Sequence, residues 1–62
     1  MDMESIIDIL RATVDWSETD GRDVKEILDT YINESNKAEF LKELEKPGNF
    51  NKFQQKVIKE YL

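Results

Sequence analysis

The stretch DVKEILDTYIN, residues 23–33, decides the fold that we predict for this chain. Its apolar residues recur at the spacing i, i+3, i+4, i+7 and i+8, which places them on one stripe of an amphipathic helix. They are Val24, Ile27, Leu28, Tyr31 and Ile32. Apolar segments precede and follow this stretch and can cover the stripe. We therefore expect a central helix against which the other segments pack.

Composition restricts both the fold and the chemistry. The 62 residues include no Cys and no His, with only one Pro and two Gly. The chain therefore has no thiolate, and it lacks the side chain that most often serves as a transition-metal ligand or general base. Helix-forming residues dominate, and no long stretch alternates with period 2. We expect an all-α single domain, residues 1–62, with no catalytic residues, cofactor or metal.

The apolar periodicity predicts four short amphipathic helices, at about 3–14, 21–33, 37–46 and 51–62. Loops of roughly 3–7 residues connect them, and such short loops favour antiparallel or sharply angled neighbours. The expected core consists of Ile6, Leu10, Val14, Ile27, Leu28, Tyr31, Phe40, Leu44, Phe53, Val57 and Tyr61.

Capping residues mark the expected helix starts. The predicted N-caps are Asp2, Asp20, Asn36 and Asn51, because each carries a side-chain acceptor directly before a helical pattern. For the second helix, Asp20 with Asp23 reads as a capping box that puts Gly21 in the first turn, and Ser17 is an alternative cap that starts a turn before it. The Lys-Pro-Gly sequence at 46–48 should end the third helix.

Charge is distributed unevenly along the chain. Residues 1–34 hold ten acids and three basic residues, for a net charge of −7, whereas residues 35–62 hold six lysines and four glutamates, for +2. A negative first half repels phosphate backbones and attracts basic protein surfaces. We therefore expect the acidic loop and second helix to contact a partner, and the candidate residues are Asp15, Trp16, Glu18, Asp20, Asp23, Glu26 and Asp29.

Three features of the sequence allow more than one interpretation. Trp16 is either a binding anchor or a lid on the end of the core, and the second interpretation suits a chain with few apolar contacts. The acidic segment 15–26 has the length of a calcium loop, but Gly21 falls at the seventh position, where the sixth is required. The lysines of the last helix could face nucleic acid, although they also suit a solvated face at a helix C-terminus.

The leading functional hypothesis is a small, acidic, non-catalytic interaction module, similar to an inhibitor or adaptor, that binds an as yet unidentified protein. In one variant, the acids mimic the phosphates of DNA. The alternatives are a homodimer that buries Met3, Ile9, Leu41 and Leu62, and a nucleic-acid-binding protein. Acids occupy the start of the chain, where a secretory signal needs basic residues, and no apolar run approaches the roughly 20 residues of a membrane span. We expect a cytoplasmic protein of bacterial or phage origin.

Overall fold

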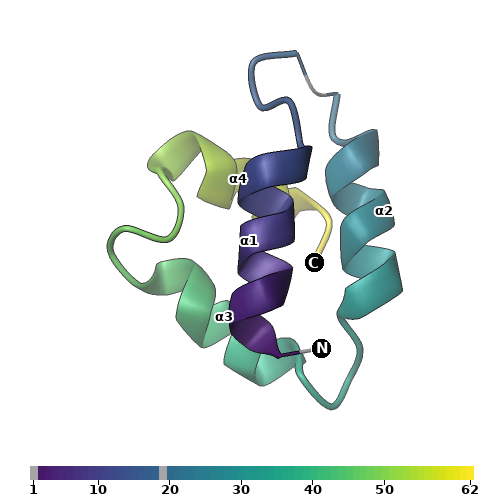
Figure 1. Ribbon diagram of the computed structural model, residues 1–62, viewed down its shortest axis with the longest axis vertical. Coiled ribbons are helices and arrows are strands. Elements are labelled where there is room, and N and C mark those ends of the chain that lie inside the picture. The colour runs from purple at the N-terminus through teal and green to yellow at the C-terminus, as the bar shows by residue number, and fades with distance from the viewer. Residues whose placement is uncertain (1, 19) are drawn as a thin grey trace.

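Four α-helices and no strand make up the part of the chain that the computed structural model describes, which is residues 2–18 and 20–62 (Figure 1). The helices are α1 (Met3–Thr13), α2 (Arg22–Tyr31), α3 (Lys37–Glu45) and α4 (Lys52–Glu60). The prediction of an all-α fold with four short helices is therefore confirmed. Each observed helix is one to three residues shorter than predicted.

Helix α2 lies against both α1 and α4. Figure 1 shows α1 and α2 side by side, with α3 at the lower left of the view and α4 starting at the upper left and passing behind α1. The principal axes of the molecule measure 30 × 24 × 19 Å. Helix α2, which carries most of the apolar stripe of residues 23–33, therefore contacts both the first and the last helix.

Each helix contributes to one apolar core. The buried residues are Ile6, Ile7 and Leu10 of α1, Val24 and Leu28 of α2, Phe40 and Leu44 of α3 and Ile58 of α4, together with Val14 and Phe50 of the loops. Among the described residues, no polar or charged side chain is buried. Stability therefore comes from apolar burial, at about 25 cal/mol per Å², and the surface ion pairs add little.

The prediction of the core was wrong mainly at α4. Phe53 was expected to be buried, but 53% of its surface is exposed, and Val57 is only half-buried. The physical reason is that the turn after α3 folds Phe50 back into the core, where it is 5% exposed. Helix α4 then presents Ile58 inward, and the 100° step per residue carries Phe53 about 140° away from that direction.

Two predicted N-caps are confirmed. The Asp2 carboxylate accepts the Ser5 N–H at 2.8 Å, directly before α1. Asn51 and Gln54 form a complete capping box at α4, with both hydrogen bonds between 2.8 and 2.9 Å. These side chains satisfy N–H groups that the first helical turn leaves without partners.

Asn36, by contrast, makes a different set of hydrogen bonds from those predicted. It occupies the N-cap position of α3 but forms no side-chain cap bond there. Its amide instead donates to the Tyr31 carbonyl at 2.9 Å and accepts the Asn33 N–H at 2.8 Å. Because these bonds satisfy backbone groups at the end of α2, the helix ends at Tyr31 rather than at Asn33.

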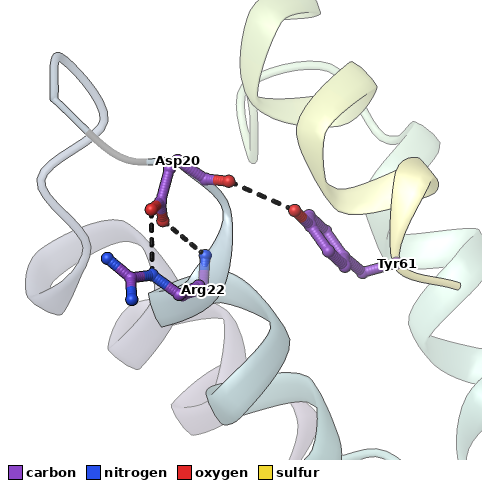
Figure 2. A network of polar contacts seen from close by, with 3 residues as sticks. All are labelled: Asp20, Arg22 and Tyr61. Carbon is purple, nitrogen blue, oxygen red and sulfur yellow. Dashed lines mark hydrogen bonds and ion pairs between the residues drawn. The ribbon is translucent and has the colours of Figure 1, made fainter.

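The predicted cap of α2 was also wrong, since Gly21 rather than Asp20 holds the N-cap position. Gly21 is buried with φ +95°, a left-handed conformation that glycine adopts at little cost. A Cβ atom there would overlap the ring of Tyr61. The Tyr61 hydroxyl donates to the neighbouring Asp20 carbonyl at 3.2 Å (Figure 2). This contact, hereafter the Gly21–Tyr61 contact, joins the start of α2 to the end of α4.

Replacing Gly21 by Ala should destabilise the protein more than replacing Gly48. Both glycines have positive φ, so both substitutions incur the left-handed cost of about 1–2 kcal/mol. Only Gly21→Ala adds an overlap with Tyr61, because nothing lies within 4 Å of a Cβ at Gly48. We expect Gly21→Ala to lower the free energy of unfolding by at least about 1 kcal/mol more than Gly48→Ala does, as measured by urea denaturation.

A double-mutant cycle tests the cause of that excess. In a Tyr61→Ala background, Gly21→Ala should cost no more than Gly48→Ala, because the overlapping ring is gone. An excess of the same size in both backgrounds would contradict this explanation.

Candidate protein-binding surface

A groove runs between α1 and α2 on the outer surface of the protein. Ile9 and Thr13 line it from α1, and α2 contributes Asp23, Glu26, Ile27, Thr30 and Tyr31. Its volume is about 530 Å³. The apolar floor consists of Ile9, Ile27 and Tyr31, all of which are half-buried.

Helix periodicity explains why this floor is only half-buried. On α2 the fully buried residues are Val24 and Leu28, and Ile27 and Tyr31 lie at the edge of the same stripe. On α1, Ile9 lies beside the buried Leu10 but is turned 100° away from it. The two helices therefore bury the centres of their stripes and leave the neighbouring edges to form a shared apolar floor.

Two carboxylates border this floor without an ion-pair partner in the described part of the chain. Asp23 and Glu26 are exposed, and neither forms an ion pair with another residue among 2–18 and 20–62. The wall of the groove therefore carries two negative charges next to apolar surface. Of the seven predicted partner-binding residues, these are the two that line the groove.

Asp29 lies on the same helix, but its charge is balanced. Its carboxylate is 2.8 Å from the Lys25 ammonium one turn earlier. The hydrogen bond to Asp29, together with its negative charge, raises the pKa of Lys25 above its ordinary value. Asp29 therefore contributes little net field to the surface, and it lines no part of the α1–α2 groove.

The acids of the loop mainly organise their own backbone. The Asp15 carboxylate accepts hydrogen bonds from both the N–H and the hydroxyl of Ser17. These bonds form a turn at Ser17, the residue that the sequence analysis gave as an alternative helix cap. The Asp20 carboxylate accepts the Arg22 N–H at 3.0 Å and the Arg22 Nε–H at 2.9 Å (Figure 2). Glu18 is exposed, and its N–H donates to the Asp15 carbonyl.

Trp16 packs inward from the same loop. Its ring meets Phe50 edge to face, with centroids 6.5 Å apart, and it is half-buried against the core. The indole Nε1 is buried and finds no hydrogen-bond partner among the described residues. This packing position corresponds to the lid-like interpretation of Trp16, in which the ring covers the end of the core.

A second acidic hollow was not anticipated from the sequence. It lies between α1 and α3, and its acids are Asp2, Glu4, Asp8, Glu39 and Glu43, beside Arg11. Asp2 caps α1, and the hydrogen bond from Lys46, with its positive charge, keeps the pKa of Glu43 below its ordinary value. The described residues contain no group of three or more acids placed to hold a metal ion. Only the packing of α1 against residues from the basic half of the sequence brings these acids together.

The lysines of α4 differ in their partners. The Lys59 ammonium lies 2.6 Å from a Glu45 carboxylate oxygen, so α3 neutralises its charge. Lys52 and Lys56 are exposed and form no ion pair with another described residue. A phosphate-binding helix would thus have two available cations on a protein with a net charge of −5.

No protein-family model, curated protein or solved structure matches this chain. None of the helices in residues 2–18 and 20–62 has the length and apolar character needed to cross a membrane. The functional assignment therefore depends on the surface described above.

The Asp20–Arg22 pair should make stability depend on pH on the acid side. The Arg22 N–H hydrogen bond, helped by the Arg22 charge, lowers the pKa of Asp20 below its ordinary value of 3.8. Because the pKa is lower in the folded state than in the unfolded state, ionised Asp20 adds to the free energy of unfolding. This stabilisation is present above pH 3.8 and disappears as the pH falls through the folded-state pKa. Asp20→Asn should therefore lower the free energy of unfolding at neutral pH but have less effect in acid.

The measurement is urea unfolding of both proteins across a series of pH values, followed by the fluorescence of Trp16, the single tryptophan. Asn retains an acceptor for the Arg22 N–H but not for the Arg22 Nε–H, so the comparison measures the carboxylate charge together with its ion pair to Arg22. A difference between the two proteins that stays constant from neutral pH into acid would exclude this linkage.

Proposed function

We propose that this protein is a non-catalytic interaction module that binds a basic amphipathic helix of a partner protein in the α1–α2 groove. The observation that carries the proposal is the combination of an apolar floor with two carboxylates that have no ion-pair partner among the described residues. Asp23 and Glu26 border Ile9, Ile27 and Tyr31 within one groove. Such a site favours a ligand with apolar anchors at helical spacing and cations beside them.

Electrostatics favours a basic partner over an acidic one. The groove lies in the half of the chain that carries a net charge of −7, so the long-range field attracts cationic surfaces and speeds their association. Once the partner is bound, the apolar floor of the groove packs against the apolar side chains of the partner and adds affinity that charge attraction alone does not provide. An inhibitor or adaptor role fits this arrangement, because such a protein works by occupying a partner surface rather than by chemistry.

The absence of histidine and cysteine from the chain supports the non-catalytic part of the proposal. The serines have no imidazole to activate them. The acids of the loop are engaged in short-range turns and in the Asp20–Arg22 pair, as described above. The Ser17 hydroxyl donates to the Asp15 carboxylate at 2.7 Å, and this bond closes a local turn of the loop.

The binding proposal can be tested with a synthetic amphipathic helix that carries leucines on one face and lysines on the other. We expect NMR chemical-shift changes centred on Ile9, Ile27 and Tyr31, and an affinity that falls as salt screens the charges. The double substitution Asp23→Lys/Glu26→Lys should weaken binding about tenfold, since two rim attractions become repulsions.

A control with the same change in net charge distinguishes the groove from a general field effect. Glu4→Lys/Glu39→Lys reverses two acids of the hollow between α1 and α3 and leaves the groove intact. We expect this variant to bind within about threefold of the unmodified protein. Equal weakening by both double variants, or shift changes centred elsewhere, would refute the assignment of the groove.

A further inference from the structure

A second apolar surface lies on α4 and shares no residue with the α1–α2 groove. Phe53, Val57 and Tyr61 follow one another at intervals of four residues, which places them in a row along the helix. Phe53 is 53% exposed, and Val57 and Tyr61 are half-buried. We call these three residues the α4 ridge. Among the described residues, Leu41 at 37% is the one other large apolar residue that is exposed.

The charges around the α4 ridge balance one another. Lys56, Glu60 and Asp20 line the same shallow hollow as the ridge. Asp20 is already paired with Arg22, which leaves Lys56 and Glu60 as the two charges of the hollow without an ion-pair partner among the described residues. The lining of the hollow therefore has almost no net charge, although the protein as a whole carries −5.

We propose that the α4 ridge is the interface through which two copies of this chain form a two-fold dimer. Two molecules of charge −5 repel each other wherever their acidic surfaces meet. The ridge is the place where apolar surface can be brought together without that repulsion. A basic partner, by contrast, gains no net charge attraction from this surface and is drawn to the α1–α2 groove. The dimer does not depend on the function proposed for the groove.

The spacing of the charges suits a two-fold axis. Lys56 and Glu60 lie one turn apart on the same side of α4. An axis that crosses α4 between them pairs the two helices antiparallel and exchanges these two positions. Each Lys56 then lies beside Glu60 of the second copy, which is the self-complementarity that an isologous interface requires. Phe53 of each copy meets the Tyr61 end of the other ridge.

A weak dimer requires only a small part of the surface of each chain. A specific contact of about 1,200 Å² in total takes about 600 Å² from each copy, which is about one seventh of the 4335 Å² surface of one chain. With one exposed phenylalanine from each copy as the largest apolar contact, we expect an affinity in the micromolar range or weaker. No residue of the α1–α2 groove lines the ridge hollow, so a dimer would present two grooves at once.

The test is sedimentation equilibrium of the chain from micromolar to millimolar concentration. We expect reversible growth from the 7.3 kDa monomer toward twice that mass. Phe53→Ser should raise the dimer dissociation constant at least about tenfold without loss of helical circular dichroism, because Phe53 lies outside the core. Leu41→Ser is the matched control, since Leu41 is 37% exposed on α3 and should leave the dimer unchanged.

Charge exchange tests the two-fold geometry. Lys56→Glu and Glu60→Lys should each weaken the dimer, and the double variant Lys56→Glu/Glu60→Lys should recover most of the affinity at an unchanged net charge. Lys42→Glu on α3 has the same effect on net charge as Lys56→Glu and should weaken the dimer less. A monomer at every concentration, a dimer that Phe53→Ser leaves intact, or a double variant no better than the single ones would overturn the proposal.

Discussion

The contact of the Tyr61 ring with the backbone of Gly21 is the constraint on which the arrangement of the four helices depends. Glycine is required at this position both by its positive φ and by the space that the ring occupies. The contact fixes where α2 begins and holds the last helix against it. Helix α2 also packs against α1, so it contacts both the first and the last helix.

Those remaining edges divide the surface into two kinds of apolar patch. The groove between α1 and α2 has acidic walls, whereas the α4 ridge has balanced charges. A chain of 62 residues cannot bury every apolar side chain of four amphipathic helices, because its surface is large relative to its volume. The residual apolar surface is thus a consequence of size, and the charges beside each patch determine which partner it suits.

The sequence was sufficient to predict the helices, because each has a clear 3.6-residue period and most have a local start or stop signal. It was insufficient where one side chain had several possible partners. Asn36 could cap α3 or the end of α2, and only the three-dimensional path of the turn decides between them. Phe50 lies between the predicted third and fourth helices, but the turn around Gly48 folds it into the core, and Phe53 is left exposed.

The candidate site was predictable to a similar extent. The helical period correctly places Asp23 and Glu26 on an exposed face of α2. The charge count could not show that Asp29 is neutralised by Lys25 or that the Asp20 carboxylate is engaged by Arg22. The hollow between α1 and α3 combines acids from both halves of the sequence, so no count over a continuous segment could reveal it.

The hydrogen bond between Tyr61 and Asp20 joins residues 41 positions apart, while the helices it connects are held by bonds that span only four. Local helices form within microseconds, whereas a contact across most of the chain must wait for the intervening segments to pack. The same separation couples the two ends in the native state. Opening at the end of α4 would release the first turn of α2, so backbone amides in these distant segments should exchange with solvent deuterium as one cooperative unit.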